Sequence, residues 1–271
     1  MSLQIKYPVS PGTMARNAST AEHPFALDGL VGAWGAGIDP SAHDLSGHGG
    51  IGTVNGGVTL AGTDAGRAWD FDGIDGYISI ASSAVPTGQD PPTTRCFWVY
   101  QRTRTNGVNS AVLDQIKGAN EGFVIQCATV SSSDFLFTDS VNSANNISTT
   151  LPTLNTWVHV TFTMDVGKKW NYYLDGALVA NGTFSQTIQL DSNAISIGRR
   201  TSGVIAYYDG LIDDVRVYDV EQSSDWVMRN YLLGLTGRYA WARRKPIQIP
   251  YEPAAAPAGG APPMLTLLGV G

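Results

Sequence analysis

The sequence predicts an all-β fold, a sandwich or barrel of antiparallel strands, followed by one short helix. Of the 271 residues, 31 are glycine and 11 are tyrosine, whereas glutamate is rare. This composition favours short strands and tight turns over helices. Short apolar or alternating runs are also separated by clusters of Gly, Asn, Asp and Ser, which is the pattern of a β-sandwich or barrel.

Changes in composition divide the chain into three parts. Residues 1–26 are polar, contain three prolines and show no sustained periodicity, so we expect an extended N-terminal arm. Residues 27–233 hold the strand-like runs and form the expected domain. Residues 234–271 become rich in Pro, Ala and Gly, a composition that cannot bury enough apolar surface to fold alone. We expect them to form an extended C-terminal arm.

The clearest structural element is a hairpin within residues 157–180. Asp175 and Gly176 separate two apolar runs and supply the positive φ angles that a two-residue turn requires. In the preceding run, WVHVTFTM, apolar and polar residues alternate, which places His159 on the more polar face of a strand. We expect His159 to be a solvated histidine of the sheet.

Residues 222–233 are the segment with helical character. Trp226, Asn230 and Leu233 recur at helical spacing, and a preceding serine could cap the start. We expect this helix to cover one end of the sandwich.

Charge and segment lengths limit the classes of partner. The net charge of −6 argues against a broad nucleic-acid surface, although Arg238, Arg243, Arg244 and Lys245 form one basic cluster. The start of the chain does not resemble a signal peptide, and no apolar run reaches the roughly 18 residues of a membrane span. We therefore expect a soluble protein with no direct nucleic-acid contact.

Cys96 and Cys127 are the two cysteines, and both lie in strand-like runs. Two buried thiols are the simplest interpretation, and a disulfide between them is the alternative.

Five motifs occur in the order found in the laminin G-like and pentraxin-like jelly rolls of the concanavalin A-like lectin/glucanase superfamily. The stretch LVGAWGAGIDPSAHDLSGHGGIGTVNGGVTL resembles that family's opening strand, its Asp-x-Ser-Gly-x-Gly loop and the next strand. GRAWDFDGIDGYISI is similar to its Phe-Asp-Gly segment, LNTWVHVTFTMDVGKKWNYYLDGALV to its Trp-x-His strand and hairpin, and YYDGLIDDVRVYDVEQSS to its closing strand. The resemblance covers about residues 29–233.

This resemblance implies a two-sheet antiparallel jelly-roll sandwich. Seven apolar residues are then candidates for its core: Phe71, Trp98, Val160, Phe162, Ile197, Val215 and Val217.

Catalysis is disfavoured by the residues present. A glucanase of this superfamily would need two carboxyl groups at a fixed separation, as in Glu-x-Asp-x-Glu, and no such motif occurs. Asp213 and Asp214 are adjacent and would point to opposite faces of a strand. HExxH, CxxC, GxSxG and Walker-type motifs are also missing from the sequence. We assign no catalytic residue.

The stretch HDLSGHGG, residues 43–50, contains the residue types of a catalytic triad. Neighbours in a glycine-rich turn point in divergent directions, so we interpret it as a turn with exposed histidines. Asp44 keeps one functional possibility, because the resemblance implies that Asp44 and Asp213 could approach each other as calcium ligands. The alternative is that Asp44 forms an Asx-turn and Asp213 caps a hairpin or pairs with Arg216.

Aromatic residues and amides on loops or on a concave face would suit glycan binding. Trp170, Tyr207 and Tyr208 are the candidates for it. Trp170 shares its parity along the strand with Tyr172, so both could instead pack inward. Tyr172, Asn171 and Asn109 are weaker candidates.

These features lead to one functional hypothesis and two alternatives. The first is a structural protein of a phage virion, a decoration, minor capsid or tail-associated protein made in the host cytoplasm, whose arms bind neighbouring subunits or copies of itself. A carbohydrate-binding or adhesion module is the alternative, and a polysaccharide-degrading enzyme is the third. The residues expected to assemble with neighbours are Arg243, Arg244, Lys245, Leu265, Leu267 and Leu268.

Overall fold

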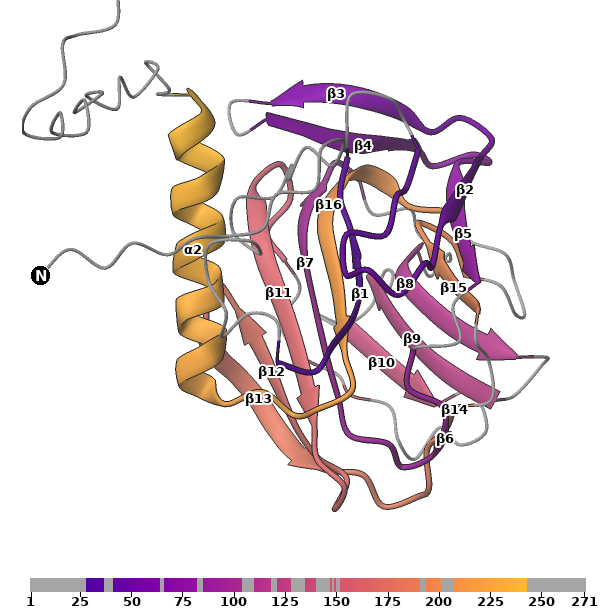
Figure 1. Ribbon diagram of the computed structural model, residues 1–271, viewed down its shortest axis with the longest axis vertical. Helices are drawn as coiled ribbons and strands as arrows, with labels where there is room; N and C mark the ends of the chain where they lie inside the picture. Colours follow the sequence, from indigo (N-terminus) through magenta and orange to yellow (C-terminus); the bar gives the residue numbers. More distant parts are fainter. Residues whose placement is uncertain are drawn as a thin grey trace, which may run out of the picture.

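A computed structural model describes residues 28–36, 41–63, 66–81, 85–103, 110–117, 121–127, 135–139, 147, 149, 152–190, 194–200 and 207–242. Antiparallel strands dominate these residues, and α2 (Ser224–Ala242) is the one helix among them (Figure 1). The strands are β1 (Leu30–Trp34), β2 (Gly52–Asn55), β3 (Thr59–Thr63), β4 (Gly66–Asp72), β5 (Tyr77–Ala81), β6 (Gly88–Gln89), β7 (Thr93–Gln101), β8 (Ser110–Lys117), β9 (Glu121–Cys127), β10 (Phe135–Asp139), β11 (Trp157–Met164), β12 (Lys169–Leu174), β13 (Ala177–Thr183), β14 (Gln189–Leu190), β15 (Ala194–Ile197) and β16 (Asp209–Tyr218).

Two large sheets form the body of the described region. The eight-stranded sheet has the order β13-β12-β11-β7-β16-β4-β3, with β1 also paired to β16. The six-stranded sheet has the order β10-β9-β8-β15-β5-β2, and β14 and β6 form a separate short pair. Neighbours such as β7 and β16 are far apart in sequence, as jelly-roll connections require. The predicted antiparallel sandwich is confirmed.

The hairpin between β12 and β13 turns where the sequence predicts. Asp175 has φ 50° and Gly176 has φ 77°, and Leu174 pairs with Ala177 on either side of the turn. The turn is also tied to β11, because the backbone N–H of His159 donates to Asp175 Oδ1 over 2.8 Å. One short motif therefore fixes the register of three strands.

The predicted core residues are all buried, but they do not all lie between the sheets. Six of them join the hydrophobic cluster between the sheets, and each of the six is at most 1% exposed: Phe71, Val160, Phe162, Ile197, Val215 and Val217. Trp98 is 3% exposed and points to the opposite side of β7. There its ring contacts those of His159 at 5.0 Å and Tyr231 at 5.8 Å between centroids.

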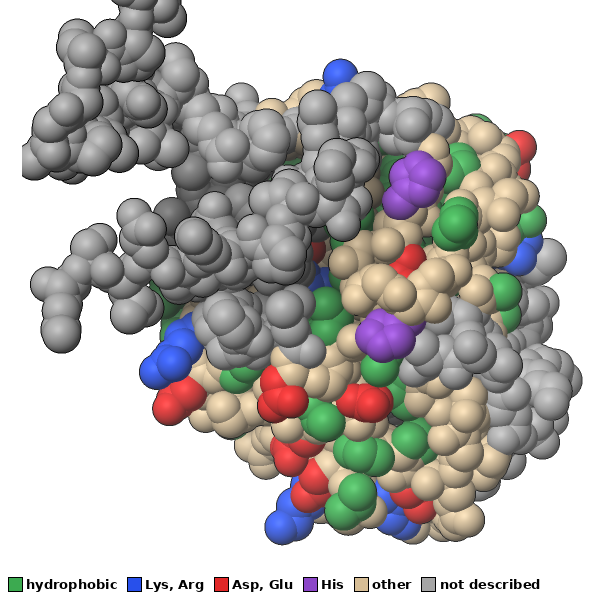
Figure 2. Space-filling view, in the orientation of Figure 1, with side chains coloured by type: hydrophobic (Ala, Val, Ile, Leu, Met, Phe, Trp, Pro, Cys, Tyr) green, Lys and Arg blue, Asp and Glu red, His purple; other side chains and the backbone are tan. Residues whose placement is uncertain are grey.

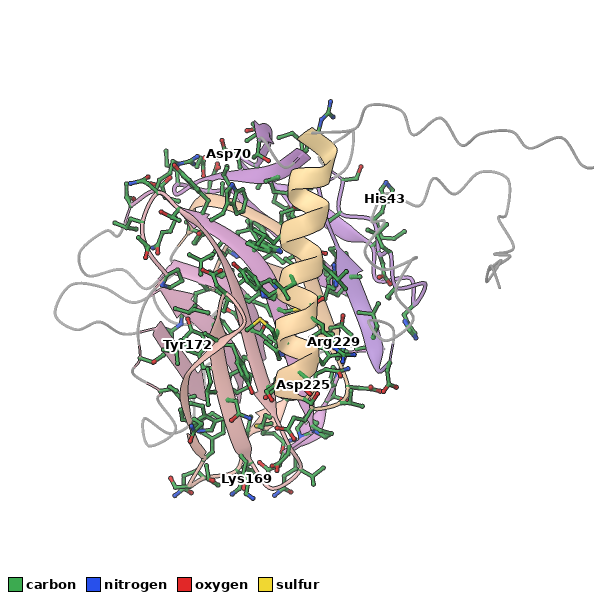
Figure 3. All side chains as sticks on the ribbon, turned by 90° about the vertical axis from the view of Figure 1, so that its left-hand side faces the viewer. His43, Asp70, Lys169, Tyr172, Asp225 and Arg229 are labelled. Atoms are coloured by element: carbon green, nitrogen blue, oxygen red, sulfur yellow. The ribbon has the colours of Figure 1, made fainter. Side chains whose placement is uncertain are left out.

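Helix α2 is longer than expected and lies elsewhere. It includes residues 234–242, which we expected in the C-terminal arm, and it lies along the outer face of the eight-stranded sheet (Figure 1, Figure 3). Trp226 and Val227 pack there in a second apolar cluster with Cys96 and Tyr218. The expectation that the helix covers one end of the sandwich is wrong, because this sheet presents apolar side chains on both faces.

The same packing corrects the expectation for His159. Alternation along β11 correctly places His159 on the face that points away from the sandwich core. The side chain is only 2% exposed, because α2 covers that face, and its Nε2 lies 3.4 Å from Nδ2 of Asn230. His159 is a buried member of the layer between helix and sheet.

Candidate functional site

An aromatic and basic patch lies on the outer face of the six-stranded sheet, at its β2–β5 edge. Ile78 and Ile80 of β5 point into the core, so Tyr77 and Ser79, which alternate with them, point outward. Asn55 of β2 pairs directly with Tyr77 and shares its face. We call this surface the Tyr77 patch, and it consists of Thr53, Asn55, Tyr77, Ser79, Arg199 and Tyr207.

Two side chains of the patch come from a distant part of the sequence. Arg199 and Tyr207 form an isolated antiparallel bridge, which puts them on one side of the backbone. Cζ of Arg199 lies 3.5 Å from the centroid of the Tyr77 ring, and the rings of Tyr77 and Tyr207 are 6.5 Å apart and inclined by 46°. A cation is thus held over one ring beside a second aromatic face.

Polar groups lie next to these rings. Nδ2 of Asn55 donates to the carbonyl oxygen of Thr53 over 2.8 Å and to Oγ of Ser79 over 3.3 Å. Asn55, Tyr77, Ser79, Arg199 and Tyr207 are each half-buried, so they are held in place and still reach solvent. Aromatic faces with a few fixed polar groups are the combination by which proteins bind small polar ligands such as sugars.

The charge of Arg199 is not neutralised by the acidic residues that the structure describes. Arg102 shows the contrast, because it forms ion pairs with Asp70 over 2.7 Å and Asp209 over 2.8 Å. Within the same part of the chain, no ion pair involves Arg199 or its neighbour Arg200, and the Nε atom of each is buried without a hydrogen-bond partner. The patch therefore offers positive charge to a ligand.

The structure separates the three residues predicted to bind glycan. Tyr207 belongs to the patch. Tyr208 is 0% exposed and packs edge-on against Phe71, since neighbours in an extended chain point to opposite faces. Trp170 is half-buried against the sandwich core, 5.9 Å from the ring of Phe184. The expectation for Tyr208 is thereby corrected, and Trp170 presents only part of its ring.

The weaker glycan candidates do not gather at one place. Tyr172 is 1% exposed and belongs to the core. Asn171 donates to Oε1 of Glu221 over 3.4 Å on the larger sheet. Asn109 lies outside the described residues.

Sequence reasoning missed Tyr77 and Arg199. The outward parity of Tyr77 in YISIA, where Tyr77 and Ser79 alternate with the apolar Ile78 and Ile80, is a usable signal. No local signal marks Arg199, because its place over Tyr77 follows from the pairing of β15 with β5.

Asp44 organises the loop that follows β1. Its Oδ1 accepts hydrogen bonds from the backbone N–H of Ser46 (2.9 Å), the hydroxyl of Ser46 (2.6 Å) and the N–H of Ala33 (3.2 Å), and its Oδ2 accepts one from Gly50 N–H (3.1 Å). The Asx-turn alternative is confirmed. Four donors fill the roughly four acceptor positions of a carboxylate, so a calcium ion would have to displace some of them.

Asp213 approaches the same segment from β16. Its Oδ1 accepts the backbone N–H of Ala36 over 3.1 Å. The expected alternative pairing of Asp213 with Arg216 is wrong, because a bulge follows Asp213 and Asp214, with φ 54°, pairs with Arg216 instead. No cluster of three or more metal-binding side chains occurs in the part of the chain that the structure describes. Calcium at Asp44 and Asp213 stays a prediction, which calorimetry with calcium and a chelator tests.

The HDLSGHGG stretch contains a chain of side-chain contacts, but not in the order of a catalytic triad. Ser46 donates its hydroxyl proton to Asp44, and Nδ1 of His48 lies 3.1 Å from Oγ of Ser46. In a triad the histidine receives the serine proton and the aspartate orients the histidine. His43 and His48 are exposed, and histidine side chains are visible on this surface (Figure 2).

A buried polar cluster connects α2 to the larger sheet. Arg216 donates to Asp214 through Nε (2.8 Å) and Nη2 (2.6 Å) and to Oδ1 of Asn230 through Nη1 (2.8 Å). Cys96 is a free cysteine, so the alternative of a disulfide with Cys127 is not realised. Burial raises the pKa of the Cys96 thiol to about 12, so the thiol is protonated and unreactive at neutral pH.

A depression of about 360 Å³ lies at the start of α2. Its lining residues include Asp225 and Arg229, which extend from the helix (Figure 3). Trp226 also lines it but is only 6% exposed, and Gln222 is committed to the carbonyl oxygen of Asp28 over 2.7 Å. The depression therefore offers no aromatic face, and the Tyr77 patch is the better candidate site.

Several predictions concern residues outside the described ranges. These include the N-terminal arm, residues 1–26, and the six residues expected to bind neighbouring subunits: Arg243, Arg244, Lys245, Leu265, Leu267 and Leu268. Among the helical residues that the structure describes, none form a stretch long and apolar enough to cross a membrane.

Several solved structures similar to this one are described as binding domains. The binding domain of Paraclostridial Mosquitocidal Protein 1 superposes with a TM-score of 0.62 at 18% identity, over 76% of this chain and 52% of that chain. Domain 4 of AbnA, a GH43 extracellular arabinanase from Geobacillus stearothermophilus solved with arabinotriose, gives 0.59 at 17% identity, over 74% and 98%. A botulinum neurotoxin type C structure, described as depending on two ganglioside molecules for cell entry, gives 0.62 at 15%, over 78% and 52%.

These identities show the fold alone, and the match spans about half the length of the toxin domains. No curated protein shows significant sequence similarity to the chain. Residues 71–228 match the Laminin_G_3 family model, described as Concanavalin A-like lectin/glucanases superfamily. Because this match covers more than half of the 271 residues, the chain belongs to the Laminin_G_3 family of the concanavalin A-like lectin/glucanase superfamily.

Proposed function

We propose that this chain is a non-catalytic carbohydrate-binding module and that its ligand binds at the Tyr77 patch. One observation carries the proposal: Tyr77 and Tyr207 lie side by side on an accessible sheet face, with Arg199 stacked on Tyr77 and the amide of Asn55 beside it. This reverses the ranking from the sequence, where a virion structural role came first.

The similar structures support a binding role over a catalytic one. The arabinanase domain that matches over 98% of its length was solved with arabinotriose, and the toxin structure is described with gangliosides. On this chain, Asp213 and Asp214 of β16 are held by Ala36 and Arg216. They therefore do not form the facing carboxyl pair of a glycoside hydrolase.

The experiment is a glycan array followed by calorimetry on the best ligand. We expect Tyr77→Ala and Tyr207→Ala each to weaken binding about tenfold, equivalent to about 1.4 kcal/mol. Tyr207→Ala removes an aromatic contact surface, and Tyr77→Ala removes the ring on which Arg199 is stacked. Tyr77→Phe keeps the ring and is expected to keep most of the affinity.

Tyr100→Ala tests an alternative location for the binding site. Tyr100 and Trp157 form another aromatic pair, with centroids 5.8 Å apart, on the opposite face of the sandwich. Loss of binding in Tyr100→Ala with full binding in Tyr77→Ala would move the site to that pair. No binding to any glycan on the array would refute the proposal as a whole.

We further propose that this carbohydrate-binding module is a component of a phage virion. Its support is the polar first arm and the Pro/Ala-rich last segment of the sequence, which suit contacts with neighbouring subunits. A glycan-binding body on a particle surface would contact host glycans. Deletion of residues 250–271 is expected to leave the folded domain and its glycan binding intact and to abolish incorporation into particles. Unchanged incorporation would contradict this role for the C-terminal residues.

A further inference from the structure

We propose that the ligand of the Tyr77 patch is an acidic glycan whose carboxylate is bound by Arg199. This inference rests on the proposed function and adds the chemical class of the sugar. It follows from the placement of one cation, from the hydrogen bonds of the acidic residues nearby, and from the aromatic and polar side chains beside the cation.

Arg199 is fixed in position without being neutralised. Its bridge to Tyr207 sets the backbone, and the stacking of Cζ at 3.5 Å on Tyr77 sets the side chain. Stacking on a ring occupies the flat face of a guanidinium and leaves its terminal N–H groups available around the edge. The rotamer entropy that a ligand would otherwise have to remove is already lost in the free protein.

The arginine has an unmet electrostatic requirement. A guanidinium that is partly withdrawn from water loses hydration, and in a folded protein an acidic group usually compensates. Asp214 does so for Arg216, and Asp70 and Asp209 do so for Arg102. No acidic side chain within the described ranges does so for Arg199, whose Nε is buried without a hydrogen bond.

The acidic residues nearest in sequence to Tyr77 are already committed. Oδ1 of Asp75 accepts the N–H of Gly57 over 2.6 Å. Oδ1 of Asp72 accepts the N–H groups of Ile74 (2.9 Å), Asp75 (3.1 Å) and Gly76 (3.0 Å). Both carboxylates are turned toward the loops before β3 and β5 and leave the Arg199 position to a ligand.

The chemistry then selects an acidic sugar. A planar carboxylate matches the paired N–H groups of a guanidinium, and a charge-assisted hydrogen bond is about twice as strong as one to a neutral hydroxyl. Tyr207 supplies a face for the pyranose ring, and Asn55 and Ser79 supply an amide and a hydroxyl for its other oxygens. Uronic and sialic acids share this combination of ring and carboxylate.

Two matched pairs of probes test the inference on the full chain. Trigalacturonic acid is compared with its methyl ester, and sialyllactose with its methyl ester, so that the two members of each pair differ in the ionised carboxylate. We expect at least one acidic probe to bind about tenfold more tightly than its neutral counterpart. This preference should shrink as NaCl rises from about 50 mM to about 500 mM. The pair that shows it separates uronic from sialic acid.

Variants assign the preference to Arg199. Arg199→Gln is expected to bring the acidic-to-neutral ratio close to one, and Arg199→Lys, which keeps the charge without the fork, to keep part of it. Arg229→Gln removes an exposed arginine on α2 and should leave the ratio unchanged. Thermal melting confirms that each variant is folded.

The possible failures are distinguishable. Equal affinity for acidic and neutral probes, with loss in Tyr207→Ala, would overturn the carboxylate assignment and leave the carbohydrate-binding proposal standing. A preference that survives Arg199→Gln, or tightest binding to a sulfated heparin oligosaccharide, would also overturn it. Absence of binding to all probes and to the array would overturn both proposals.

Discussion

The outer faces of the two sheets carry the same kinds of side chain, but these side chains have different roles on the two faces. Under α2, Arg216 lies at 2% exposure and is bound to Asp214 and Asn230. On the six-stranded sheet, Arg199 lies over Tyr77 at the surface, and no described acidic residue pairs with it. Each face combines arginine, tyrosine and asparagine, but only the covered face satisfies its charge internally.

This difference indicates which face stabilises the fold and which one is available for binding. Burial acts to lower the pKa of Arg216, but the charge of Asp214 beside it helps to raise that pKa well above its usual value, so the guanidinium stays charged in the interior. Asn230 joins that pair to His159 and Cys96 at 3.4 and 3.5 Å. A polar group whose partners all lie inside the chain has few hydrogen-bonding positions left for a ligand. Arg199 still has such positions.

Removing the Asp214 carboxylate under α2 should have the largest effect on the stability of the fold. Asp214→Ala leaves Arg216 buried and without its ionic partner, which is expected to lower the free energy of unfolding by about 3–5 kcal/mol. Urea denaturation measures the change, and Asp219→Ala, at an exposed position before α2, is the control. A loss below about 1 kcal/mol would mean that the pair does not stabilise the helix–sheet layer.

Asn230→Ala should have an intermediate effect. It removes the amide that accepts from Arg216 and contacts the ring of His159, and so leaves buried polar groups without a partner. We expect a loss of about 1–3 kcal/mol in urea denaturation, with glycan affinity unchanged. A loss of glycan binding in a folded Asn230→Ala protein would contradict the separation of the two faces.

Asp72, in the loop next to the Tyr77 patch, should make a small, pH-dependent contribution to the free energy of unfolding. Burial acts to raise the pKa of Asp72, but hydrogen bonds from the backbone of Ile74, Gly76 and Asp75 together lower the pKa by more. The pKa therefore lies below the ordinary value of 3.8. The stabilisation is therefore present above about pH 4 and is lost as the pH falls through the lower folded-state pKa. Comparison of Asp72→Asn with the unmodified chain should show a difference below about 1 kcal/mol at pH 7, because the site is accessible to solvent.

That difference between the two proteins should shrink toward zero in acid. Melting temperatures measured between pH 7 and pH 2 test this trend. A difference that grows with acidity would contradict the assignment of the hydrogen bonds to the ionised carboxylate.

Arg199→Gln should have the smallest effect on stability. Because no described ion pair is lost, we expect the free energy of unfolding to change by less than about 0.5 kcal/mol. Urea denaturation compares this change with that of Asp214→Ala. A loss as large as that of Asp214→Ala would show that Arg199 is a structural residue and would remove the contrast between the two faces.

The sandwich could be predicted from the sequence because its motifs are local. The Asp175-Gly176 turn and the alternation in β11 each specify geometry within a few residues. The position of α2 could not be predicted, because periodicity shows that a helix forms and does not show which surface it covers. For the same reason His159 was assigned to the correct face and the wrong environment.

The candidate site was only partly visible in the sequence. Tyr207 was identified as an aromatic residue on a loop, but Tyr208 beside it looked equivalent until the bridge to Arg199 fixed which ring points outward. The contact of Arg199 with Tyr77 joins segments far apart in the chain through β15 and β5. Sequence reasoning without a topology has no means of bringing them together.

The most direct test of glycan binding at the Tyr77 patch is an NMR titration of the isotopically labelled chain with trigalacturonic acid and, separately, sialyllactose. We predict that the amide signals shifted by at least one of the two probes are those of β2, of β5 and of Arg199 and Tyr207, while signals of β11 and α2 stay in place. Shifts confined to the region of Tyr100 and Trp157, or to the start of α2, would contradict it.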